Sequence, residues 1–129
     1  MQYIFTDAGA RAAGWGENND CTVRSLAIAA VIPYATAWQI AAGIGRRTNR
    51  AFNMEQLMEK ARGVLGLNFN KITFSPPLQI EDFITKYPSG RYIVCTKWHT
   101  CVVVDSVVYD SSEKSMGAIT LAYEMLPPS

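Results

Sequence analysis

Hydrophobic residues recur with helical spacing in the first half of the chain, and the clearest case begins at Cys21. Apolar side chains follow at the i, i+3, i+4, i+7 and i+8 positions that form one face of a helix. They are Val23, Leu26, Ala27, Ala30 and Val31. Asn19 or Asp20 stands just before them and can cap a helix. The pattern predicts a helix that begins at Cys21 and buries this face.

Three further helices are predicted downstream. The second begins at Pro33 and ends at Gly43 and Gly45. Its buried side is formed by Tyr34, Ala37, Trp38 and Ala41. A solvated loop with Arg46, Arg47 and Arg50 follows. Asn53 is the expected cap of the third helix, which ends near Gly66 with Met54, Leu57, Met58 and Ala61 facing inward. The fourth spans 80–87 and is stopped by Pro88.

The later part of the chain changes to the alternating pattern of strands. Strands are expected at 67–74, where Pro76 and Pro77 would end the run, and at 91–96, 99–104, 107–110 and 118–125. Residues 1–5 can form a short edge strand, and 6–20 form a loop. Helices first and strands later predict an α+β domain over residues 1–129, with the Cys21 helix packed on a C-terminal antiparallel sheet.

Composition narrows the classes of function. The chain has 129 residues, 49% of them hydrophobic, so one domain with a substantial core is expected. The net charge of +1 disfavours nucleic acid and anionic membranes as partners. No apolar run approaches 18 residues, and the N-terminal sequence has no signal-peptide pattern. A membrane partner is therefore not expected.

The three cysteines point to a reducing compartment. An odd number of cysteines is unusual for a secreted disulfide framework, so a cytoplasmic location is expected. Cys95, His99 and Cys101 do not have the paired spacing of zinc ligands. We therefore expect neither a metal nor another cofactor.

Cys21 is placed where a catalytic thiol would be expected. A helix N-terminus carries partial positive charge and unpaired N–H groups, which stabilise a thiolate. The same N–H groups can bind the oxyanion of a tetrahedral intermediate. The alternative is that Cys21 is a small packing residue, as most free cysteines are.

His99, the only histidine, can meet a carboxylate if the chain turns at Asp105 and Ser106. A two-residue turn places Val104 opposite Val107, and His99 then becomes a diagonal neighbour of Asp110 on the same face of the hairpin. Asp110 would orient the imidazole and leave its other nitrogen for Cys21. Asp105 is the rival carboxylate, but it lies about 20 Å along an extended strand and has a sufficient role in the turn.

Several other residues are candidates for the same site. Asn19 and Asn18 lie just upstream of Cys21 and can contribute to an oxyanion hole, with Gln2 as a more distant candidate. Trp98 adjoins His99, and Arg24 lies one helical turn after Cys21, so both are candidate substrate contacts. For Arg24 the other interpretation is a salt bridge. Cys101 would share the face of His99 and is the rival nucleophile, although it lacks a helix N-terminus.

Two segments resemble a widespread group of small bacterial and phage proteins with a papain-like fold. The group carries patterns similar to DGGRAAAG…GDCVVRAIAIAT…PY and LPSGRYIV…SxHxVAVxDGxxxDT. Here these segments read FTDAGARAAGWGENNDCTVRSLAIAAVIPY and YPSGRYIVCTKWHTCVVVDSVVYDSS. The resemblance covers nearly the whole chain except residues 45–75. The chain departs from the group at two places: Asp105-Ser106 stands where the group often has Asp-Gly, and Asn19 stands where it commonly has Gly.

The resemblance implies Cys21 as nucleophile, His99 as base and Asp110 as the orienting residue of a thiol hydrolase. A peptidase, isopeptidase or amidase acting on a peptide or protein is expected, in the cytoplasm of a bacterium or a phage-infected host. A deamidase or acyl transferase would use the same groups. The alternative that is not an enzyme is a phage-type protein that binds or inhibits a host protein. Binding of nucleic acid through Arg46, Arg47 and Arg50 is the least favoured interpretation.

Overall fold

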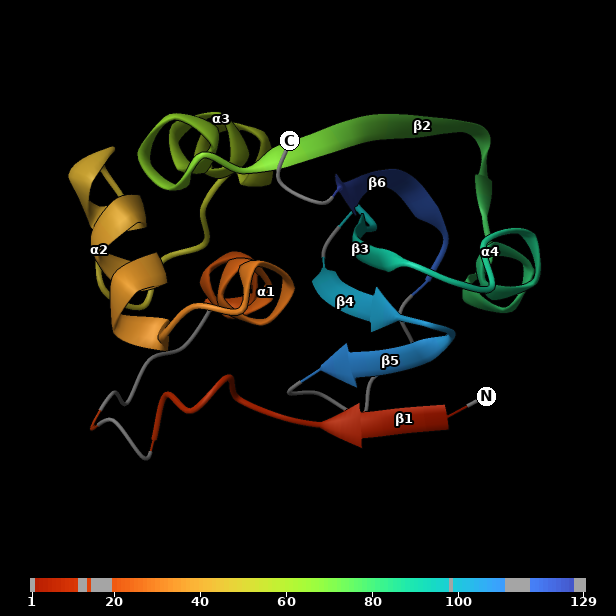
Figure 1. Ribbon diagram of the computed structural model, residues 1–129, viewed down its shortest axis with the longest axis horizontal. Helices are drawn as coiled ribbons and strands as arrows, with labels where there is room; N and C mark the ends of the chain where they lie inside the picture. The colour runs from red at the N-terminus through yellow and green to blue at the C-terminus, as the bar shows by residue number, and fades with distance from the viewer. Residues whose placement is uncertain (1, 12–13, 15–19, 98, 111–116, 127–129) are drawn as a thin grey trace.

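The computed structural model describes residues 2–11, 14, 20–97, 99–110 and 117–126. These residues form four helices and one six-stranded mixed sheet, which confirms the predicted α+β class. Figure 1 shows the sheet between two groups of helices, with α1, α2 and α3 on one side and α4 on the other.

The four helices begin close to their predicted positions. They are α1 (Cys21–Ala30), α2 (Tyr34–Gly43), α3 (Met54–Leu65) and α4 (Ile80–Lys86). Asn53 caps α3 as predicted, because its side chain accepts a hydrogen bond of 3.0 Å from the Gln56 N–H. Gly66 ends the same helix in the left-handed conformation, which glycine adopts without steric cost.

The sheet is larger than the antiparallel C-terminal sheet that the pattern predicts. Its strands are β1 (Gln2–Phe5), β2 (Asn68–Leu78), β3 (Arg91–Cys95), β4 (Thr100–Val104), β5 (Val107–Asp110) and β6 (Ile119–Leu126). Their order is β1-β5-β4-β3-β6-β2. The N-terminal strand β1 pairs with β5 in parallel, so the sheet is mixed. Parallel pairing brings together segments distant in sequence, which a local pattern does not reveal.

The prolines in β2 do not end the strand, contrary to prediction. The strand continues to Leu78, past Pro76 and Pro77, because it lies at an edge of the sheet. Its pairing with β6 shifts register between Thr73 and Leu78. An edge position and an irregular register are the settings in which a strand tolerates proline.

Two hydrophobic cores lie on opposite faces of the sheet. The larger core joins the sheet to α1, α2 and α3, and includes Leu26, Leu57 and Ile93. The smaller core lies against α4 and includes Phe83, Tyr92 and Val103. The Cys21 helix therefore packs on one face of the sheet, as predicted.

Two residues differ from their predicted exposure. Val31 is 75% exposed, because α1 ends at Ala30 and Val31 turns away in the left-handed conformation. Arg46 is only 6% exposed although its loop was expected to be solvated. Its backbone N–H donates to the Ala41 carbonyl at 3.0 Å, which holds Arg46 against the end of α2. Arg47 and Arg50 are exposed as predicted.

Within the described residues, every helix is too short or too polar to cross a membrane.

Candidate active site

Cys21 is the first residue of α1 and is half-buried. Asp20 occupies the N-cap position, and its backbone carbonyl accepts the Arg24 N–H at 2.9 Å. The Asp20 carboxylate makes no capping hydrogen bond; it accepts instead from Arg24 Nε at 2.8 Å and from the Tyr34 hydroxyl at 2.7 Å. The Asp20 side chain therefore does not occupy the first N–H groups of α1.

His99 lies immediately before β4 rather than within a strand, which corrects the predicted strand over 99–104. Pairing of β3 with β4 ends at Cys95 and Thr100. The Thr96 N–H donates to the His99 carbonyl at 2.8 Å, and the His99 N–H donates to Thr96 Oγ1 at 3.1 Å. These reciprocal hydrogen bonds close the connection between the strands and fix the backbone of the histidine.

Asp110 is the last residue of β5 and is buried. The turn at Asp105 and Ser106 is formed as predicted, since Val104 pairs with Val107. Both turn residues have positive φ, 48° and 71°, as a two-residue type I′ hairpin requires. The register therefore carries Asp110 back to the level of His99.

The imidazole of His99 connects a carboxylate to the thiol. Its Nε2 lies 2.5 Å from Asp110 Oδ2, and the Cys21 side chain lies close enough to the ring to contribute to its raised pKa. Because Asp110 occupies Nε2, Nδ1 is the ring nitrogen that remains for Cys21. The structure thus brings together all three residues predicted to be catalytic.

This environment favours the charged form of the imidazole. The hydrogen bond to Asp110 is the largest cause, and the neighbouring Cys21 side chain the second, of a rise in the pKa of His99 to about 9. Partial burial of the ring acts in the opposite direction. The raised pKa favours an imidazolium at neutral pH, next to the Asp110 carboxylate and the Cys21 side chain.

The other two cysteines are in surroundings that suppress nucleophilic chemistry. Cys95 and Cys101 are buried, whereas Cys21 is half-buried. Burial raises the pKa of Cys95 to about 11 and raises the pKa of Cys101 well above its usual value. A thiol that stays protonated is a poor nucleophile, so Cys101 does not compete with Cys21.

Asp105, the rival carboxylate, has a structural role. Its Oδ1 accepts the Gly90 N–H at 2.8 Å, and its own N–H donates to the Gly90 carbonyl at 2.8 Å. These bonds attach the β4–β5 turn to the loop before β3. Asp105 therefore lies at the opposite end of the hairpin from His99.

The remaining predicted site residues have different outcomes. Asn18, Asn19 and Trp98 lie outside the described residues. Arg24 forms the salt bridge with Asp20, and it also lines a hollow beside β1. Gln2 pairs with Val107 at the end of β1 far from Asp110, so it does not join the site.

Two contacts that position the site were not expected from the pattern. Tyr34 was predicted only as a buried apolar residue, yet its hydroxyl holds Asp20 beside Cys21. The Thr6 N–H donates to the Asp110 carbonyl at 2.8 Å and so fixes the end of β5. The sequence carries no local signal for either contact, because each joins segments that meet only in the folded chain.

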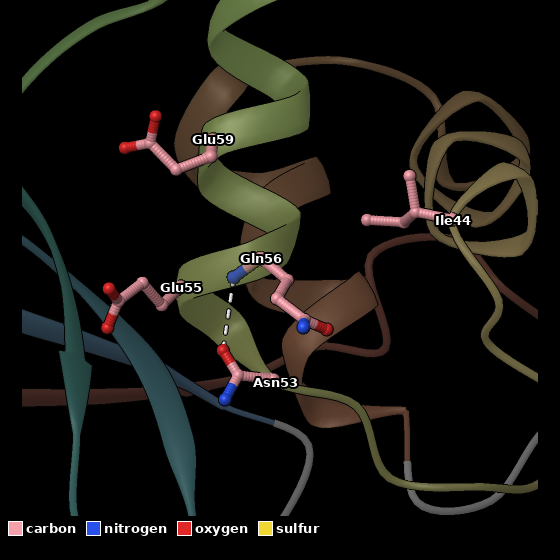
Figure 2. Close-up of a pocket in the computed structure, with 5 residues that line it drawn as sticks. All are labelled: Ile44, Asn53, Glu55, Gln56 and Glu59. Carbon is pink, nitrogen blue, oxygen red and sulfur yellow. Dashed lines mark hydrogen bonds between the residues drawn. The ribbon is translucent and has the colours of Figure 1, made fainter.

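A larger hollow, of about 650 Å³, lies away from this site, between the end of α2 and the start of α3. Figure 2 shows its lining residues, with Gln56 extending toward Ile44 and the two carboxylates of Glu55 and Glu59 on the other side of α3. Glu55 is already paired with Lys71 at 3.0 Å. The hollow contains no nucleophile, and no group of three potential metal ligands occurs among the described residues.

Comparisons with known proteins give no further guide to this site. The chain matches no protein-family model, no curated protein and no solved structure. The chemistry is therefore inferred from the contacts of Cys21, His99 and Asp110.

Proposed function

We propose that the protein is a papain-like thiol hydrolase in which Cys21 is the nucleophile, His99 the acid and base, and Asp110 the residue that orients His99. The observation that carries the proposal is the placement of His99, whose ring is hydrogen-bonded to Asp110 and lies beside the Cys21 side chain, which also contributes to its raised pKa. An imidazole held in this way can move a proton to and from a thiol along a fixed direction.

The first half of the proposed reaction forms an acyl-enzyme. The Cys21 thiolate attacks the carbonyl carbon of an amide, and the new oxyanion accepts N–H groups at the start of α1. The imidazolium of His99 then donates its Nδ1 proton to the amide nitrogen. The carbon–nitrogen bond breaks, the amine leaves, and a thioester remains on Cys21.

The second half returns the enzyme to its starting state. The neutral imidazole takes a proton from a water molecule, and the resulting hydroxide adds to the thioester carbonyl. The carbon–sulfur bond breaks, which releases a carboxylic acid and restores the thiolate beside the imidazolium. A deamidase loses ammonia in the first half, and an acyl transferase admits an amine in place of water.

The papain-like part of the proposal has two supports. The first is the resemblance of the segments around Cys21 and His99 to small bacterial and phage proteins of that fold. The second is the arrangement of a thiol at the N-terminus of a helix, packed on a sheet whose strand connection holds the histidine. The proposed substrates are peptides, isopeptides or other amides, and a bacterial or phage-infected cytoplasm is the proposed location.

The test is alkylation of the three cysteines by iodoacetamide, followed by mass spectrometry between pH 5 and 9. Near pH 7 we expect Cys21 to react at least about tenfold faster than Cys95 and Cys101, because only it is paired with an imidazolium. His99→Ala removes this advantage, and Asp110→Asn reduces it. Asp105→Asn is the matched control, because it makes the same chemical change in a carboxylate that does not contact His99.

The proposal fails if Cys21 reacts as slowly as the buried cysteines, or if His99→Ala leaves its rate unchanged. Capture of one host protein with equal yield by wild type and Cys21→Ala would then favour the non-enzymatic binder. Rapid alkylation of Cys21 that depends on both His99 and Asp110 justifies screening of peptide, isopeptide and glutamine substrates.

A further inference from the structure

A second hollow, of about 350 Å³, lies beside the proposed catalytic residues. It is lined by Phe5, Thr6, Asp7, Arg11 and Arg24. Phe5 pairs with Asp110, and Arg24 follows Cys21 by one turn of α1, about 4.5 Å along the helix axis. Figure 1 shows that β1 and β5 both end on the side of the sheet where α1 lies. The hollow is therefore lined by a strand neighbour of Asp110 and by a residue one helical turn from Cys21, although neither of these two proposed catalytic residues lines it.

The carboxylates near the hollow are already occupied. Asp7 accepts the Gly9 N–H at 2.9 Å through Oδ1 and the Arg11 N–H at 3.1 Å through Oδ2. The hydrogen bond from Arg11 is the largest cause of the lowered pKa of Asp7, so this carboxylate is ionised. Asp20 is held by Arg24 and by the Tyr34 hydroxyl. Neither carboxylate is arranged to recruit a cation.

The guanidinium of Arg11 is the remaining charged group on the rim. Arg11 is exposed, and among the described residues its side chain forms no ion pair or hydrogen bond. Arg24 is oriented along α1 by its ion pair with Asp20. The ring of Phe5, which is 56% exposed, forms an apolar wall. Two arginines around a hollow with an apolar wall suit a carboxylate carried on a short hydrocarbon chain.

We infer that this hollow is a specificity subsite that receives an acidic side chain of a peptide substrate next to the bond cleaved at Cys21. The inference rests on the proposed function, because it assigns a substrate class to the same site. Arg11 is the principal specificity residue, since Arg24 is shared with Asp20.

The test uses dipeptide amides with an epoxide that alkylates Cys21, carrying Glu or its isostere Gln on one or the other side of the epoxide. For the wild type we expect the Glu probe to inactivate about fivefold faster than the Gln probe on one of the two sides. Arg11→Ala brings this ratio to nearly 1, and Arg11→Glu inverts it in favour of the Gln probe. Arg50→Glu is the control, because it makes the same charge change in an exposed loop away from the hollow.

Use of the Glu-to-Gln ratio separates this inference from the proposed function. If iodoacetamide labels Cys21 rapidly but the ratio is 1 on both sides of the epoxide, the subsite is wrong and the hydrolase proposal stands. An equal fall of the ratio in Arg50→Glu also overturns the subsite, since a general field would then account for the preference. If Cys21 is not activated at all, the hydrolase proposal fails and the subsite fails with it.

Discussion

His99 combines a charge with a shielded position, and this combination determines its chemistry. The side chain is 24% exposed, while that of Asp110 is 5% exposed. A carboxylate with so little contact with solvent interacts strongly with a nearby cation, because water screens the pair poorly. The imidazolium therefore enters the proposed reaction as the acid for the leaving amine and becomes the base only after it has lost a proton.

The raised pKa of His99 predicts a pH dependence of stability. The protonated ring stabilises the folded state fully below its ordinary pKa of 6.5, and this contribution is lost as the pH rises through about 9. Wild type should therefore be more stable than His99→Gln at low pH. This difference in unfolding free energy should shrink as the pH rises from 6.5 to about 9, by up to about 1.4 kcal/mol per pH unit. Urea unfolding at pH 6, 7, 8 and 9 measures it.

A Cys21→Ala background identifies the cause of this dependence. Because Asp110 contributes most to the shift, the narrowing of the difference should persist when the thiol is absent. A constant difference from pH 6 to 9 would show that the imidazole is not stabilised as a cation in the folded protein.

The three proposed catalytic residues were predictable because each has a local signal. Cys21 follows a capping position and precedes a helical repeat, and the turn at Asp105 fixes the separation of His99 from Asp110. The supporting contacts were not predictable. Tyr34 satisfies the expectation of a buried residue whether or not its hydroxyl meets Asp20. Periodicity reports which residues are buried, but not which polar atoms meet.

The end of α1 shows a conflict between sequence and backbone. Val31 adopts φ 56° and ψ 51°, and its N–H donates to the Ile28 carbonyl at 3.4 Å. The next N–H, from Ile32, donates to the Ala27 carbonyl at 3.0 Å, which completes a Schellman motif. Glycine is the usual residue at this position, and a β-branched side chain is strained there. The packing of α1 and α2 thus imposes the turn against local preference.

Replacement of this valine should stabilise the protein. Val31→Gly is expected to raise the unfolding free energy by about 1 kcal/mol, because the relief of left-handed strain exceeds the entropy that glycine adds to the unfolded chain. Val64 is the matched control: it is also exposed, but it lies in helical backbone near the end of α3. Val64→Gly should lower stability by about 0.5 kcal/mol. Equal signs for the two variants in urea unfolding would contradict this explanation.

Elements with an internal repeat were predicted better than those defined by distant partners. The helices have a period of 3.6 residues and recognisable ends, such as Asn53 and Gly66. The parallel pairing of β1 with β5 leaves no such pattern, because the register joins Phe5 to Asp110 across most of the chain. The same limitation affected β2, where the edge position that accommodates Pro76 and Pro77 is a property of the whole sheet.

The proposed site depends on the whole molecule, because its parts come from widely separated segments. Cys21 belongs to α1, His99 precedes β4, and Asp110 ends β5, where Thr6 holds it. α1 packs on the face of the sheet opposite α4. If the chain unfolds as one cooperative unit, a change in the α4 core must alter the stability of α1, which carries Cys21 on the opposite face of the sheet.

Phe83→Leu tests this coupling. Phe83 is fully buried in the smaller core and makes edge-on contacts with Phe74 and Tyr92, so the substitution should cost on the order of 1 kcal/mol. In urea, the loss of rapid Cys21 alkylation and the loss of far-ultraviolet circular dichroism should share one midpoint, and the substitution should lower both together. The alkylation rate without urea should stay unchanged, because the aromatic partners of Phe83 are Phe74 and Tyr92 rather than residues of the proposed site. Two separate midpoints, with only the dichroism shifted, would mean that the α1 layer unfolds independently of the α4 core.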